Sequence, residues 1–111
     1  MTPNLIVLTN LPDQPAAEAL AERLVAQRLA ACVNILAPCT SVYRWQGETE
    51  RSTEVPMLIK TTAACYAALE AAIVEAHPYE LPEIVAVPIE LGLAAYLGWI
   101  ENETAPDAPA S

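Results

Sequence analysis

The stretch that decides the fold is residues 31–61, which reads ACVNILAPCTSVYRWQGETERSTEVPMLIKT. Two runs rich in β-forming residues, 31–43 and 49–61, flank a reversal at residues 43–48. Pro38 interrupts the first run and marks an edge or a bulge, because proline cannot donate to a hydrogen-bond ladder. The stretch therefore predicts a β-hairpin.

The predicted hairpin is long for a small domain. At ~3.3 Å per residue, each arm would reach roughly 35–40 Å, about twice a typical strand. The whole chain has 111 residues, the size of one domain, and cannot cover both arms. An exposed strand edge invites uncontrolled pairing, so we expect the overhang to pack on another chain.

Shorter elements flank the hairpin. Before the hairpin, the sequence predicts a strand over residues 5–9 and a helix from an Asp13 cap to near Arg28. After the hairpin, it predicts a helix over 63–76 capped by Thr62, a strand over 84–87 and a helix over 94–102. The order β-α-β-β-α-β with an appended helix is an α+β, ferredoxin-like split βαβ pattern. In that pattern a four-stranded antiparallel sheet carries both main helices on one face.

The charge balance narrows the choice of partners. Five Lys or Arg residues against fourteen Asp or Glu residues leave a formal charge of −9, which repels phosphate backbones and anionic lipids. We therefore expect no nucleic acid partner and favour cations or basic proteins. The longest late apolar stretch, residues 91–100, is too short to insert into a membrane. Three cysteines without CxxC spacing fit a reducing, cytoplasmic location.

The organisation of the chain is simple. We expect a single domain over residues 1–103 and a flexible tail over 104–111, which contains two prolines and few apolar residues. The sequence has no Ser-His-Asp or Cys-His pairing at a recognisable spacing and no glycine-rich phosphate loop. An enzyme is therefore the least favoured class of function.

Five separated blocks of the sequence resemble the CutA family, the divalent-cation tolerance proteins. The blocks are residues 29–35, 41–47, 54–61, 77–84 and 96–99. The resemblance implies a homotrimer of ferredoxin-like subunits, similar in architecture to PII signalling proteins, whose long hairpins embrace neighbouring subunits. It also implies a link to tolerance of divalent cations and to copper(II) binding. The alternative function is a PII-like regulatory trimer that binds a small metabolite or partner protein in the clefts between subunits.

The resemblance places metal ligands near the end of the first strand and in the His-Pro segment. Only His77 matches, because Thr9 stands where some relatives have a cysteine and Ala76 where some have a second histidine. We predict a site for copper(II) or another divalent cation from His77, Glu80 and Glu83, since Cu(II) takes nitrogen and oxygen ligands.

These residues have plainer interpretations too. His77 follows the second predicted helix, where its ring could cap the last carbonyls. Glu80 and Glu83 could form a solvated acidic loop, or pair with Arg44 or Arg51 of an adjacent chain.

Three aromatic side chains are predicted subunit contacts, because such side chains dominate the energetics of obligate interfaces. They are Tyr43, Trp45 and Trp99. Trp45 lies at the predicted hairpin tip, where its own small domain is not expected to bury it.

Overall fold

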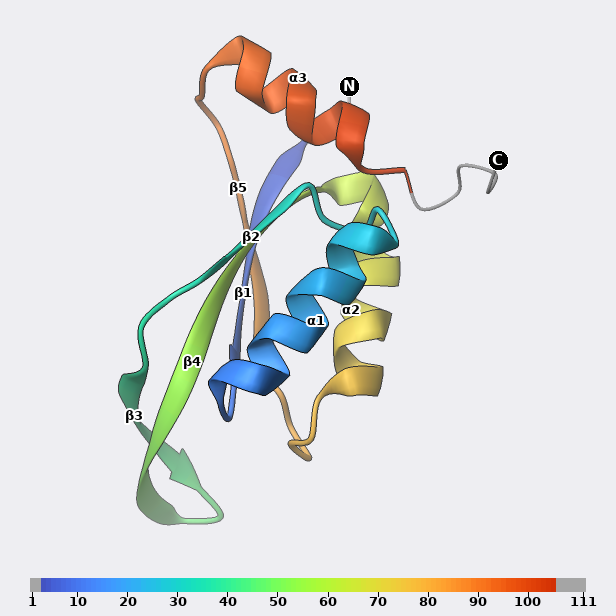
Figure 1. The fold of residues 1–111 in the computed structure, drawn as a ribbon. Helices are drawn as coiled ribbons and strands as arrows, with labels where there is room; N and C mark the ends of the chain where they lie inside the picture. The colour runs from blue at the N-terminus through green and yellow to red at the C-terminus, as the bar shows by residue number, and fades with distance from the viewer. Residues whose placement is uncertain (1–2, 106–111) are drawn as a thin grey trace.

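The structure is a computed structural model that describes residues 3–105 of the chain. One face of an antiparallel sheet is covered by two helices, α1 (Gln14–Ala26) and α2 (Tyr66–Ala76), which contact each other (Figure 1). A third helix, α3 (Ala94–Glu103), lies across one end of the sheet (Figure 1). The predicted α+β class is confirmed, with both main helices on one face. No helix within residues 3–105 is long and apolar enough to cross a bilayer.

The sheet has the strand order β2-β4-β1-β5, with β3 paired to the outer part of β4. The strands are β1 (Asn4–Leu11), β2 (Cys32–Ile35), β3 (Cys39–Trp45), β4 (Glu48–Thr62) and β5 (Ile84–Pro88). Residues 55–62 of β4 pair with β1, whereas residues 48–54 pair with β3. The β3–β4 hairpin therefore projects beyond the two-layer body, as the strand lengths predicted (Figure 1).

The reversal of the hairpin is a two-residue turn. Gln46 has φ 51° and Gly47 has φ 83°, so both residues adopt the left-handed conformation. Two successive residues of this kind are typical of a type I′ turn, whose twist matches that of the flanking strands. Glycine carries no steric penalty there, because it has no Cβ.

Local signals fixed the first helix. The Asp13 carboxylate accepts the N–H of Ala16 at 2.9 Å, so the predicted N-cap is confirmed. Residues at helical spacing along α1 then pack on the sheet and on α2. The core side chains with no exposed surface include Val7, Leu24, Met57, Ile59, Leu69 and Ile73.

The interruption expected at Pro38 is confirmed, because residues 36–38 separate β2 from β3. One expectation about local structure is wrong. Thr62 does not cap a helix through its side chain: the chain first forms a 3-10 turn, η1 (Ala63–Cys65), and the Thr62 hydroxyl contacts the Cys65 sulfur at 3.4 Å. The N–H of Ala63 donates instead to the Pro3 carbonyl at 2.8 Å.

Arg28 joins the end of α1 to the end of α3. Its guanidinium Nη2 donates to the Asn102 carbonyl at 2.7 Å, and its Nε donates to the Glu103 carbonyl at 3.4 Å. These carbonyls end α3 and have no partner within the helix. Thr104 follows the helix and is buried, with its hydroxyl donating to the Ile100 carbonyl at 2.9 Å. Of the predicted tail 104–111, residues 106–111 lie outside the described residues.

The Arg28 contacts predict a measurable loss of stability. We expect Arg28→Ala to lower the free energy of unfolding by about 1–2 kcal/mol, because a charged donor to two helix-end carbonyls is lost. Arg23→Ala is the matched control, since Arg23 makes a solvent-exposed ion pair with Glu75 at 3.1 Å, and such pairs contribute about 0–1 kcal/mol. Urea unfolding measures both, and an Arg28→Ala loss no larger than that of Arg23→Ala would contradict the role of Arg28.

Candidate functional site

The predicted site lies in the loop that joins α2 to β5, residues 77–83, at the end of the sheet from which the hairpin projects (Figure 1). Pro78 and Pro82 disfavour helix on either side of the loop and end α2 at Ala76. The loop therefore starts with His77, which has extended backbone angles of φ −81° and ψ 133°.

His77 is buried, with 8% of its surface exposed. Its Nε2 lies 2.6 Å from the Asn10 carbonyl oxygen, and its Nδ1 accepts the N–H of Tyr79 at 3.2 Å. Because a carbonyl only accepts, Nε2 carries the proton and Nδ1 carries the lone pair. The ring therefore ties the loop to the end of β1. It does not cap the last carbonyls of α2, which was the plainer expectation.

The two predicted carboxylate ligands are exposed. Glu83 accepts a hydrogen bond from the Asn10 amide at 3.1 Å, and Glu80 is solvent-exposed. Within residues 3–105 there is no group of three or more His, Cys, Asp or Glu side chains placed to hold a metal ion. The structure thus does not assemble His77, Glu80 and Glu83 into a preformed site in one chain. The Nδ1 lone pair of His77 would have to leave the Tyr79 amide before it could bind a cation.

Thr9 and Ala76, the positions at which some relatives carry a cysteine and a second histidine, do not provide an accessible metal ligand. Thr9 is 1% exposed, and its hydroxyl oxygen has no hydrogen-bond partner among the described residues. Ala76 is exposed and has no donor atom. The three cysteines are free thiols, and only Cys65 is fully buried. None of them joins a metal-binding group within residues 3–105.

A groove of about 740 Å³ runs between the hairpin and the α2–β5 loop. The hairpin contributes Ser41, Val42, Tyr43, Arg44, Trp45, Ser52 and Glu54, and the loop contributes Tyr79, Glu80, Leu81 and Glu83. Sequence reasoning missed this groove, because its two walls are more than twenty residues apart in the chain. It also assigned Glu54 to the polar side of its strand, whereas the structure buries it.

Tyr79 connects the histidine contact to the groove. Its ring packs against that of His77 in a tilted arrangement, with centroids 4.6 Å apart and planes 55° apart, and its phenol faces Glu54. Burial, and then the negative charge of Glu54, raise the pKa of Tyr79 above the usual 10.0. The phenol is therefore a neutral hydrogen-bond donor at physiological pH.

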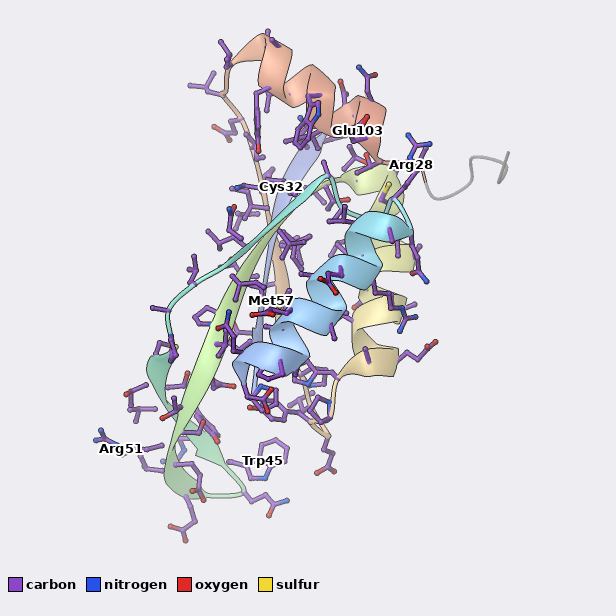
Figure 2. The ribbon with its side chains drawn as sticks, in the orientation of Figure 1. Arg28, Cys32, Trp45, Arg51, Met57 and Glu103 are labelled. Carbon is purple, nitrogen blue, oxygen red and sulfur yellow. The ribbon has the colours of Figure 1, made fainter. Side chains whose placement is uncertain are left out.

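The three predicted interface aromatics lie in different surroundings. Tyr43 and Trp99 are partly exposed, and Trp99 stacks on Tyr96 with ring centroids 5.4 Å apart. Trp45 is half-buried by its own chain, beside the α2–β5 loop (Figure 2). This burial was not expected for a hairpin tip. The role of these residues as subunit contacts stays a prediction.

Comparison with known proteins identifies the family. A family model described as CutA1 divalent ion tolerance protein matches residues 5–103. A protein of Thermus thermophilus named divalent-cation tolerance protein CutA is 44% identical over 99 residues, which cover 89% of this chain and 96% of that protein.

Solved structures agree with this match. A divalent cation tolerance protein from Thermus thermophilus superposes with a TM-score of 0.90 at 43% identity, covering 92% of this chain and 99% of that one. CutA from Xylella fastidiosa gives a TM-score of 0.89 at 42% identity, covering 92% and 98%. The chain therefore belongs to the CutA1 family of divalent ion tolerance proteins.

Proposed function

We propose that the protein acts in tolerance of divalent cations, as a homotrimer that binds copper(II) or another divalent cation. The observation that carries this proposal is the family match over residues 5–103, together with the 44%-identical relative that bears the tolerance name. The formal charge of −9 supports it, because an acidic protein concentrates cations at its surface. The cytoplasmic location stays a prediction.

The bare face of the sheet supports self-association. Strand alternation places Ile6, Leu8 and Leu58 on the face opposite α1 and α2, together with Val85 and Val87 of β5. No helix within residues 3–105 covers the middle of this face (Figure 1). Val85 and Val87 are 47% and 46% exposed. Exposed apolar side chains on a sheet face are typical of a protein–protein contact, although Lys60, the partner of Ile6, adds one charge to this face.

Two further features favour a closed assembly. The β3–β4 hairpin exposes strand edges that would otherwise pair without control. Leu91 and Leu93, in the link between β5 and α3, are 90% and 75% exposed. Packing on neighbouring copies would cover both the strand edges and the two leucines. In a closed ring every copy makes the same contacts.

The cation ligands in this proposal come from the α2–β5 loop. Glu80 and Glu83 offer exposed carboxylates, and His77 joins them only when its Nδ1 leaves the Tyr79 amide. The described chain lacks a preassembled set, so the remaining ligands would come from neighbouring subunits. Nitrogen and oxygen donors suit copper(II).

Calorimetric titration of metal-free protein with Cu(II) tests the ligand set. We expect a Glu80→Gln/Glu83→Gln double variant to bind at least about ten-fold more weakly, or ~1.4 kcal/mol, because both carboxylate charges are lost. Glu22→Gln, on the exposed side of α1, is the control for general loss of negative charge. Equal affinity of the double variant and the control would contradict a site in this loop.

His77→Ala separates the two roles of the histidine. If His77 ligates copper(II), the variant binds more weakly while remaining folded by circular dichroism. Unchanged affinity in the folded variant would rule out His77 as a ligand and leave it as the tie between the loop and β1.

Sedimentation equilibrium tests the assembly. We expect the mass of three chains at micromolar concentration, and dissociation of a Val85→Asp/Val87→Asp variant, because charges placed on the bare face oppose its burial. Val74→Asp is the matched control, since Val74 is equally exposed but lies on α2. A monomeric wild-type protein would refute the trimer.

A further inference from the structure

The groove between the hairpin and the α2–β5 loop has an aromatic and acidic lining. Its aromatic side chains are Tyr43, Trp45 and Tyr79, and its carboxylates are Glu54, Glu80 and Glu83. We name this set the aromatic–acidic groove. We propose that it binds an organic cation of the substituted-ammonium class, held against the rings and neutralised by Glu54.

The hairpin separates its charges onto two faces. Tyr43 pairs with Glu50 across the two strands, and Trp45 pairs with Glu48. Residues paired in this way point to the same face, and their neighbours in sequence point to the other.

This alternation directs both arginines of the hairpin away from the aromatic rings, although Arg44 still lines the groove. Arg51 pairs with Val42, and Arg44 follows Tyr43 in the strand. Figure 2 shows Trp45 and Arg51 on opposite sides of the hairpin. The groove lining places the one guanidinium of Arg44 beside three carboxylates, so the balance favours a cation over an anion.

Glu54 is the strongest reason to expect a cation. It is only 8% exposed, yet it lines the groove. Burying a carboxylate is costly unless an opposite charge or strong hydrogen bonds compensate it. Among residues 3–105 the one ion pair joins Arg23 to Glu75, so no lysine or arginine of the described chain neutralises Glu54. The neutral phenol of Tyr79 donates a hydrogen bond toward Glu54, which offsets part of the cost of burial but leaves the negative charge in place.

The size and lining favour an organic cation over a metal ion. A volume of about 740 Å³ is that of a small-molecule site, since such pockets span ~300–1,000 Å³. Within the described residues the carboxylates do not converge into a group that could hold one metal ion. Aromatic faces attract alkylated ammonium groups, and tryptophan does so most strongly. Hydrated divalent ions prefer oxygen ligands instead.

Calorimetric titration of the full chain with benzyltrimethylammonium chloride tests the proposal at low salt. We expect saturable binding in the micromolar to millimolar range, and no saturable binding of benzyl alcohol, which has the ring without the charge. In a Trp99→Phe variant Trp45 is the only remaining tryptophan, so quenching of its fluorescence would locate the cation in the groove. Equal binding of benzyl alcohol, or absence of quenching, would overturn the proposal.

Two variants separate the contributions of ring and charge. Trp45→Ala should weaken benzyltrimethylammonium binding by about five- to thirty-fold, the range expected for loss of a cation–π contact, and Trp45→Phe by less. Glu54→Gln keeps the shape of the side chain and should weaken binding about ten-fold. Glu80→Gln removes an exposed carboxylate of the same groove and should also weaken binding.

Glu22→Gln again controls for net charge and should bind as the wild type does. If Glu54→Gln and Glu80→Gln match Glu22→Gln, the groove does not recognise charge and the proposal fails. The two proposals can fail separately: a protein that binds Cu(II) but not benzyltrimethylammonium contradicts this inference alone.

Discussion

The hydrogen-bond ladders of β4 are the interaction on which the rest of the structure depends. This fifteen-residue strand pairs with β1, β2 and β3 along different parts of its length. Its inner half supplies Met57 and Ile59 to the core, and its outer half forms one arm of the hairpin. One continuous strand thus connects the packed body to the projecting arm. The groove exists because that arm is held rigidly beside the α2–β5 loop.

Features set by neighbouring residues could be predicted from the sequence. The Asp13 cap and the alternation of Val55, Met57 and Ile59 need only residues within one turn or one strand. The break between β2 and β3 was harder to place, because Pro38 signals an interruption without giving its length. The Thr62 prediction failed since the free amide of Ala63 had a partner at Pro3, on a different element. A local capping motif gives no information about a hydrogen-bond acceptor on a distant part of the chain.

The site was less predictable because its contacts join distant segments. His77 was singled out from the sequence as a ligand, but the contact that the structure gives its ring is to Asn10, which lies 67 positions away in the chain. The burial of Glu54 depends on a loop that begins more than twenty residues later. An acidic residue in an alternating strand gives no sign of this. Tertiary packing therefore gives His77 and Glu54 contacts and burial that their positions in the sequence do not indicate.

If both proposed ligands bind, the position of Tyr79 would link their binding thermodynamically. Its backbone N–H occupies the lone pair of His77, while its ring forms part of the groove wall. A ligand that fixed Tyr79 in place would keep the imidazole lone pair occupied, and an ion that took the lone pair would break the hydrogen bond from the Tyr79 N–H. Occupancy at one position then changes affinity at the other by the same factor in both directions. Tyr79 would then couple the binding of a metal ion at His77 to the binding of an organic cation in the groove.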